Sequence, residues 1–191
     1  MDNRNEPLTT REIEDLARRI DRPIVLVGMM GVGKTSVGKR LAAALGSTFV
    51  DADEEIESAA RMTIPEIFAQ FGEPAFRDGE RRVIARLIEQ GGNHTEIATG
   101  GGAFSQTDTR ALILERTISV WLDSDIDTLV ERTARKNNRP LLQGGDRRET
   151  LIRLHAERSA DYAQAPIHVM SNDGPHGRTV DTVLKGIAAW L

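Results

Sequence analysis

The chain has 191 residues, of which 39% are hydrophobic and 28% charged, and its formal net charge is −4. These values are typical of one soluble globular domain with a sizeable core, and they give no overall attraction to nucleic acid or to an anionic membrane surface. The lack of cysteine excludes disulfides and thiolate metal sites. No apolar run approaches the ~20 residues needed to span a bilayer, and the N-terminus lacks the apolar core of a signal peptide. We therefore expect a cytoplasmic protein.

The N-terminal segment differs in character from the rest of the chain. Residues 1 to about 10 are polar, and we expect them to be disordered. Thr9 and Glu12 have the spacing of a capping box, which starts a short helix with its apolar residues on one face, and Pro23 ends it. We interpret residues 1–21 as an appendage to a domain formed by residues 22–191.

From residue 24 onward, strand and helix signals alternate. Short apolar runs predict strands at 24–27, 48–50, 96–99, 117–122 and 167–170. Periodicity and end signals predict helices at 33–45, 54–60, 64–71, 74–90, 107–114 and 125–135, then one ending near residue 162 and one at the C-terminus. Residues 136–147 are rich in Gly, Pro, Asn and charges, so we predict a loop there. The alternation implies parallel crossover units in a three-layer α/β domain, and it leaves the strand order open.

The strongest motif is a phosphate-binding loop between the first strand and the next helix. Gly28 to Thr35 match G-x-x-x-x-G-K-[ST] in full. Glycines let backbone N–H groups curl around phosphate oxygens, and the following helix points its positive dipole end at them. Lys34 is expected to reach the β- and γ-phosphates of a nucleotide, and Thr35 to offer its hydroxyl to magnesium. GTPases, ATPase motors and small-molecule kinases all use this loop, so it predicts nucleotide binding without choosing the reaction.

An acidic pair follows the second strand. Asp51 and Asp53 lie at the carboxyl end of that strand, which is the edge where open parallel sheets bind ligands. Asp51 can hold magnesium through water, and Asp53 can accept a proton from an attacking hydroxyl. The simpler interpretation is that Asp53 caps the next helix, whose first turn is acidic.

Further polar residues and glycines suit a binding site, although each has an ordinary explanation. Arg77 lies early on a helix with Glu80 at i+3, as in a surface ion pair. Gly100 to Gly102 follow the third strand directly, as a turn or as backbone close to a ligand. Arg139 lies on the long loop and could swing over the phosphates. Arg158 near a helix end can simply compensate the helix dipole, and the four histidines show no metal-ligand spacing.

Taken together, these segments resemble the shikimate kinase family over about residues 22–191. The matching stretches, in chain order, are Gly28 to Thr35 with Gly38, Asp51 to Asp53, Phe76 and Arg77 with Glu80, Gly100 to Gly102, Arg139 to Leu142, and Arg158 to Tyr162. The resemblance implies a P-loop NTPase fold like that of nucleoside monophosphate kinases, with a five-stranded parallel sheet flanked by helices and a lid at about 136–147. It also implies transfer of the γ-phosphoryl group of ATP to the 3-hydroxyl of shikimate, with magnesium, on the route to aromatic amino acids.

The resemblance assigns roles by matching positions. The acceptor would be held by Asp53, Arg77, Glu80, Gly101, Gly102 and Arg158, and the nucleotide by Gly31, Val32, Gly33, Lys34, Thr35, Ser36, Arg132 and Arg139. Thr35 and Asp51 would serve magnesium, and Lys34, Asp53 and Arg139 would be catalytic. Ser171 to Pro175 loosely resemble the loop that closes over adenine. We expect a monomer with no nucleic-acid or membrane partner.

Three other functions are compared with this one. A gluconate kinase on the same fold is disfavoured by the combined acidic, Phe-Arg and triple-glycine motifs. A GTP-dependent switch would carry an Asn-Lys-x-Asp string, which residues 136–139 do not match. A non-catalytic sensor is disfavoured because Lys34, Asp53 and Arg139 are all present. The third strand ends Ala98-Thr99 without an acid, which makes Asp51 the magnesium candidate.

Overall fold

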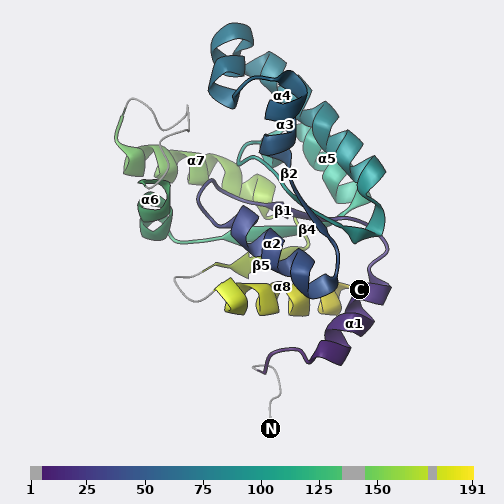
Figure 1. Ribbon diagram of the computed structural model, residues 1–191. Helices are drawn as coiled ribbons and strands as arrows, with labels where there is room; N and C mark the ends of the chain where they lie inside the picture. The colour runs from purple at the N-terminus through teal and green to yellow at the C-terminus, as the bar shows by residue number, and fades with distance from the viewer. Residues whose placement is uncertain (1–5, 135–144, 172–175) are drawn as a thin grey trace.

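Five parallel strands form the central sheet of the computed structural model, which describes residues 6–134, 145–171 and 176–191 (Figure 1). The strands are β1 (Ile24–Val27), β2 (Thr48–Asp51), β3 (Thr95–Ala98), β4 (Ile118–Asp123) and β5 (Ile167–Met170). Their order is β2-β3-β1-β4-β5, and every neighbouring pair is parallel. β1 and β3 are wholly buried, as strands covered on both faces should be. The predicted fold class is confirmed.

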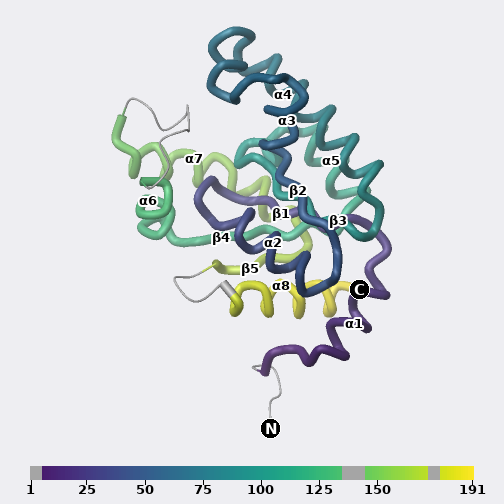
Figure 2. Tube along the Cα trace, viewed as in Figure 1, coloured from purple at the N-terminus to yellow at the C-terminus, as the bar shows by residue number. Residues whose placement is uncertain are grey.

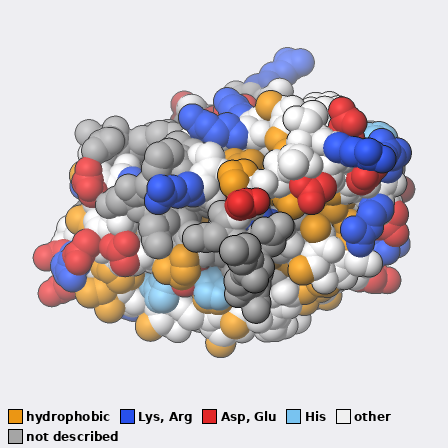
Figure 3. Space-filling view, turned by 90° about the horizontal axis from the view of Figure 1, so that it is seen from below, with side chains coloured by type: hydrophobic (Ala, Val, Ile, Leu, Met, Phe, Trp, Pro, Cys, Tyr) orange, Lys and Arg blue, Asp and Glu red, His pale blue; other side chains and the backbone are white. Residues whose placement is uncertain are grey.

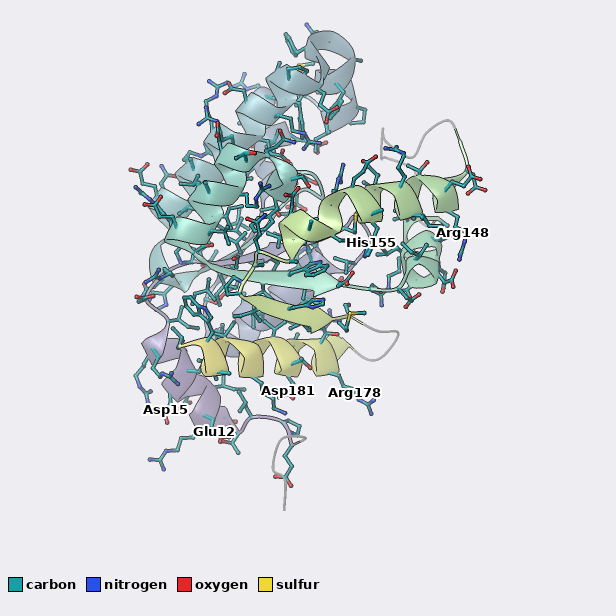
Figure 4. All side chains as sticks on the ribbon, turned by 180° about the vertical axis from the view of Figure 1, so that it is seen from behind. Glu12, Asp15, Arg148, His155, Arg178 and Asp181 are labelled. Atoms are coloured by element: carbon teal, nitrogen blue, oxygen red, sulfur yellow. The ribbon has the colours of Figure 1, made fainter. Side chains whose placement is uncertain are left out.

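Helices cover both faces of the sheet. α2 (Lys34–Leu45) and α8 (His176–Trp190) pack on each other and against the strands on one face. α5 (Thr107–Arg116) and α7 (Arg147–Tyr162) lie on the other face, and α6 (Ile126–Ala134) packs against α7 (Figure 4). Because parallel strands need long crossovers, this three-layer arrangement follows from the alternation of elements.

A helical arm extends away from the sheet at the top of Figures 1 and 2. It consists of α3 (Ala52–Ala60) and α4 (Ile64–Gly91), which pack closely on each other. Gly72 is non-helical at φ 79° and Pro74 follows it, so α4 is kinked where two separate helices were expected. Ile56, Ile67 and Phe76 form a small hydrophobic cluster of their own inside the arm. The arm therefore has its own packing and is joined to the domain through the ends of α3 and α4.

The N-terminal helix α1 (Thr10–Arg19) begins with the expected capping box between Thr9 and Glu12. It does not form a separate appendage, because Leu16 and the following Ile20 are buried in the main core. The Leu8 amide also donates to Asp181 of α8 at 3.0 Å, and Figure 4 shows Asp181 on the side of α8 next to α1. Residues 6–20 are thus packed onto the domain, while residues 1–5 lie outside the described residues.

Most element boundaries agree with the sequence patterns, and the differences have local causes. α2 ends at Gly46, which is left-handed as a C-cap glycine should be. α3 begins two residues earlier than expected because Asp51, not Asp53, caps it. Short 3-10 helices at Gly92–His94 and Ala103–Ser105 were not predicted. Among the helices that the structure describes, none is long and apolar enough to cross a membrane.

Charges of both signs are interspersed on the face of the molecule shown in Figure 3. Basic and acidic side chains alternate over that view, in keeping with the small net charge of −4. Among the described side chains of this face, we see no continuous basic surface of the kind that binds a phosphate backbone.

A glutamate is buried near the N-terminal end of β3, whereas the phosphate loop lies at the C-terminal ends of the strands. Glu96 is 2% exposed, and its carboxylate accepts a hydrogen bond of 2.5 Å from the Ser47 hydroxyl. Burial raises the pKa of Glu96, and the Ser47 hydrogen bond offsets only part of that effect. A folded-state pKa above the unfolded value of about 4.3 means that Glu96 contributes stability at low pH, and this contribution is lost as the pH rises through the folded pKa.

We therefore expect Glu96→Gln to raise the melting temperature at pH 7.5, because it removes a desolvated carboxylate and keeps a partner for Ser47. For a domain of this size, each 1 kcal/mol corresponds to about 2–4 °C. The gain should vanish near pH 3, where Glu96 is protonated in both states. Thermal unfolding at the two pH values measures this, with the exposed Glu89→Gln as control. Equal shifts at both pH values would contradict the explanation.

Candidate active site

The phosphate loop runs from the end of β1 into the first turn of α2. Gly33 is the N-cap of α2 with a left-handed backbone at φ 105°, which suits glycine, and no described side chain caps this helix. The N-terminal amides of α2 therefore point out of the helix as an anion-binding site. Lys34 is buried beside them, and its ammonium donates to the carbonyl oxygens of Gly28 at 2.6 Å and Met29 at 2.9 Å. Gly31, Val32, Gly33, Thr35 and Ser36 complete the expected nucleotide cradle.

Asp51 connects the phosphate loop to the helical arm. Its Oδ2 accepts a hydrogen bond of 2.8 Å from the Thr35 hydroxyl, and its Oδ1 accepts one of 3.1 Å from the Asp53 amide. Asp51 is thus the N-cap of α3, and the alternative that Asp53 caps this helix is wrong. The two predicted magnesium residues, Thr35 and Asp51, are brought into direct contact.

Asp53 faces a different way, toward the triple-glycine turn. A Cβ built on Gly100 would lie 2.8 Å from Asp53 Oδ1 and 2.8 Å from Glu80 Oε1. The two carboxylate oxygens are therefore at most twice that distance apart. Glu80 is 1% exposed, and its Oε1 has no hydrogen-bond partner among the described residues. Such a buried acceptor beside a second carboxylate suits the hydroxyl groups of a ligand.

Arg77 completes this wall of the site. Its guanidinium donates to Glu80 at 2.7 Å and to Glu73 at 3.1 and 3.2 Å, and it lies over the Phe76 ring at 5.1 Å. A Cβ on Gly102 would come within 2.5 Å of Arg77 Nη2, a distance that side chains do not adopt. The glycine at position 102 therefore lets the guanidinium reach the turn after β3. Arg77 does pair with Glu80, but the interpretation of this pair as an exposed surface contact is wrong, since the Arg77 side chain is only 13% exposed.

Arg158 approaches the same turn from α7. Its Nη1 donates to the Gly101 carbonyl at 2.8 Å, and the side chain is largely buried. Dipole compensation at a helix end does not explain a buried guanidinium that contacts another element.

The electrostatics show that these groups act on one another. Burial raises the pKa of Glu80, the charges of Arg77 and Arg158 lower it, and the charge of Asp53 raises it. Two guanidiniums and two carboxylates thus surround the triple-glycine turn. A polyhydroxylated carboxylic acid is the ligand class that such a set recognises, because guanidinium pairs with carboxylate in a planar fork and carboxylates accept from hydroxyls.

One further expected site residue, Arg132, contacts the phosphate loop, and others lie outside the described residues. Arg132 of α6 donates to the Val32 carbonyl at 3.2 Å, which places it against the loop. Arg139 and most of the predicted lid, 136–147, lie outside the described residues, as do 172–175 of the predicted adenine loop. Their roles stay predictions.

Two of the four histidines flank a single carboxylate. His155 Nε2 lies 3.3 Å from Asp123 Oδ1, and His168 Nε2 lies 3.5 Å from Asp123 Oδ2. His168 also stacks on Trp121 at 4.0 Å, and Figure 4 shows His155 on α7 above β4 and β5. Within the described residues, no group of three such side chains could hold a metal ion. These histidines join α7 to the sheet edge.

With this geometry established, comparison with known proteins identifies the family. A family model described as shikimate kinase matches residues 30–188. The chain belongs to the shikimate kinase family. A shikimate kinase of Novosphingobium aromaticivorans is 62% identical over 186 residues, 96% of each chain, and one of Caulobacter vibrioides is 52% identical over 91% of this chain and 86% of its own. Since the first match leaves only 4% of the chain uncovered, it includes most of α1.

Solved structures agree with this membership. The shikimate kinase of Acinetobacter baumannii, solved in complex with shikimate, has a TM-score of 0.86 at 35% identity and covers 95% of this chain and 98% of its own. A gluconokinase of Sinorhizobium meliloti reaches a TM-score of 0.60 at 18% identity over 90% of this chain and 94% of its own. That likeness shows the shared fold alone, so the gluconate kinase alternative receives no support beyond the fold.

Two functional features were not found by sequence reasoning. Asp51 acts as the cap of α3, which a strand-end aspartate followed by Ala-Asp-Glu-Glu could have suggested. Tyr162 was matched as part of a motif without a role, yet its hydroxyl reaches the Gly101 carbonyl. No local pattern reveals that contact, because the two residues are 61 positions apart.

Proposed function

We propose that this enzyme of the shikimate kinase family transfers the γ-phosphoryl group of ATP to the 3-hydroxyl of shikimate, giving shikimate 3-phosphate and ADP for aromatic amino-acid biosynthesis. One observation carries the proposal: a complete phosphate loop lies against a turn, Gly100 to Gly102, that is ringed by Asp53, Glu80, Arg77 and Arg158. These four charged side chains suit a ligand that carries one carboxylate and several hydroxyls, and the phosphate loop suits ATP. The relatives named shikimate kinase support the choice of acceptor.

The acceptor is held by charge and hydrogen bonding. Arg77 and Arg158 bind the shikimate carboxylate, each offering paired donors. Asp53 and Glu80 accept from the hydroxyl groups, and Glu80 is itself held in place by Arg77. Because two carboxylates and two guanidiniums balance each other in charge, the site can be partly desolvated without leaving an unpaired charge.

Phosphoryl transfer then requires positioning and positive charge more than covalent help from the protein. The 3-hydroxyl oxygen forms a bond to the γ-phosphorus as the bond between that phosphorus and the β–γ bridging oxygen breaks. Asp53 orients the hydroxyl and accepts its proton. Lys34 and the amides at the N-terminus of α2 stabilise the charge on the phosphate oxygens, with Arg139 as a further predicted donor.

Magnesium fits the residues beside the phosphate loop. Thr35 and Asp51 present a hydroxyl and a carboxylate in direct contact, at 2.8 Å. Magnesium that is bound with nucleotide usually takes one or two protein oxygens plus waters and phosphate oxygens, so a larger acidic cluster is not required. Bound there, the ion would neutralise charge on the β- and γ-phosphates. We also propose that the enzyme is a monomer, which light scattering in solution tests.

The decisive experiment measures ADP release from ATP and magnesium with shikimate, gluconate, AMP or no acceptor. Stimulation by shikimate alone, with shikimate 3-phosphate identified by 31P NMR, is the expected result. Stimulation by another acceptor would overturn the substrate and keep the phosphate-loop chemistry. Nucleotide binding without stimulation by any acceptor would favour the sensor function.

The close approach of Arg77 to Gly102 gives a sharper test of the acceptor site. Gly102 has an ordinary right-handed backbone at φ −108°, so Gly102→Ala adds no backbone strain but places a methyl group against the guanidinium. We expect KM for shikimate to rise about tenfold, since hydrogen bonds to charged groups are each worth about 1.5–3 kcal/mol, while KM for ATP changes little. Gly79→Ala on α4 is the control, because its Cβ would meet nothing within 4 Å. Equal effects of both variants would contradict the role of Arg77.

A further inference from the structure

The triple-glycine turn is anchored by two hydrogen bonds from one face of α7. Arg158 Nη1 donates to the Gly101 carbonyl at 2.8 Å, and the Tyr162 hydroxyl donates to the same oxygen. The two side chains are four residues apart, so they project from the same side of the helix. A carbonyl oxygen has two lone pairs, and these two donors use both.

The tyrosine is itself held rigidly. It is 1% exposed, and its ring stacks with that of Phe104, at 6.4 Å between centroids, and with that of Trp121, at 5.9 Å. The last turn of α7 is further tied to α5, because Arg110 of α5 pairs with Asp161 at 3.0 Å. The hydroxyl therefore reaches Gly101 from a fixed point of the core.

Anchoring the Gly101 carbonyl determines where the next amide points. The peptide bond is planar and trans, so the Gly102 N–H is directed opposite to the Gly101 C=O, away from α7. Gly102 is the residue against which the Arg77 guanidinium lies. The Gly101 backbone also abuts the phosphate loop, since a Cβ there would be 3.0 Å from the Met30 amide nitrogen. The anchored turn thus lies between the acceptor residues and the phosphate loop.

Building on the proposed function, we propose that Tyr162 is a positioning residue for phosphoryl transfer. Through the Gly101 carbonyl, it orients the Gly101–Gly102 peptide as a donor to the acceptor and keeps this turn in register with the phosphate loop. Burial raises the pKa of Tyr162 to about 12, so the hydroxyl remains a donor at any working pH. The effect of losing the hydroxyl should therefore be independent of pH.

The test is Tyr162→Phe, which removes the hydroxyl and keeps the ring stacked with its aromatic neighbours. With the acceptor that stimulates wild-type ADP release, we expect kcat/KM for that acceptor to fall about 5- to 15-fold, the usual effect of one buried hydrogen bond. KM for ATP should stay within about twofold, and the acceptor effect should be constant from pH 6.5 to 9. The matched control is Thr117→Val. It removes another buried hydroxyl, which donates to the Ile113 carbonyl at 2.7 Å just before the start of β4, away from the phosphate loop.

A second measurement does not depend on which acceptor the enzyme uses. In 15N-edited NMR spectra with labelled glycine, Tyr162→Phe should shift or broaden the Gly101 and Gly102 amide signals, and Thr117→Val should not. If wild-type enzyme ignores shikimate while these signals respond to Tyr162→Phe, the proposed substrate fails and the positioning role stands. Unchanged glycine signals, or acceptor kinetics that match Thr117→Val, would overturn the positioning role.

Discussion

Replacing Lys34 by methionine is expected to lower kcat by about 10²–10³-fold, the usual loss when one preorganised donor to transition-state charge is removed. The ammonium is buried within the phosphate loop, where it contacts the carbonyls of Gly28 and Met29. Methionine keeps the length and apolar stem of the side chain and removes the charge. Steady-state kinetics at saturating shikimate and ATP measure the effect.

Lys39→Met is the matched control for this change. Lys39 lies on the same helix, is exposed, and has its ammonium 5.8 Å from the centre of the Phe49 ring. We expect less than a twofold change in kcat, because the charge lies outside the loop. Lys34→Met with near wild-type kcat would mean that the amides of α2 and the metal carry the phosphate charge without the lysine.

Asp53→Asn should be similarly severe, with kcat reduced about 10²–10⁴-fold, the range attributed to a positioned acid–base group. The substitution preserves shape and removes the proposed proton acceptor, which lies beside Gly100 and Glu80. A loss in kcat with unchanged KM for shikimate would assign Asp53 to the transition state. A parallel rise in KM would show that it also binds the ground state.

Glu54→Gln provides the comparison for Asp53. Glu54 is the next residue on α3 and is exposed, so it reports any general effect of one negative charge at this helix N-terminus. Near wild-type activity is expected. Comparable losses in both variants would indicate a destabilised α3, and retention of activity in Asp53→Asn would exclude Asp53 as the group that receives the proton.

The charged side chains of the site come from separate elements, and the two guanidiniums offset the repulsion between the carboxylates of Asp53 and Glu80. Asp53 and Glu80 come from α3 and α4, whereas Arg158 comes from α7 on the main domain. Arg77 pairs with Glu80 and lies against Gly102, so it links α4 to the turn after β3. The arm has a hydrophobic cluster of its own, which holds its residues in place relative to one another, and Ile84, Leu87 and Ile88 near the end of α4 anchor it in the main core.

Much of the site could be recognised from sequence because its parts are short and consecutive. The phosphate loop, the Asp51–Asp53 pair and the triple glycine are each defined by neighbours along the chain, and their order indicated the family that the comparisons show. Strands and helices were recognised for the same reason, since apolar periodicity is a local property. The break at Gly72 was predicted too, as the boundary between two helices and not as a kink within α4, because Gly72 and Pro74 act through their own backbones.

Local sequence patterns were thus enough to predict the element order, the phosphate loop and the residue types that suit phosphoryl transfer. The packing of distant elements had to be seen to learn that Asp51 turns to Thr35 while Asp53 turns to Gly100, that α1 joins the core, and that the Tyr162 hydroxyl contacts Gly101. Among these contacts, the Tyr162–Gly101 hydrogen bond joins residues 61 positions apart. They depend on strand order and helix packing, and no local periodicity encodes either of these, because each is set by how complete elements bury their apolar faces together.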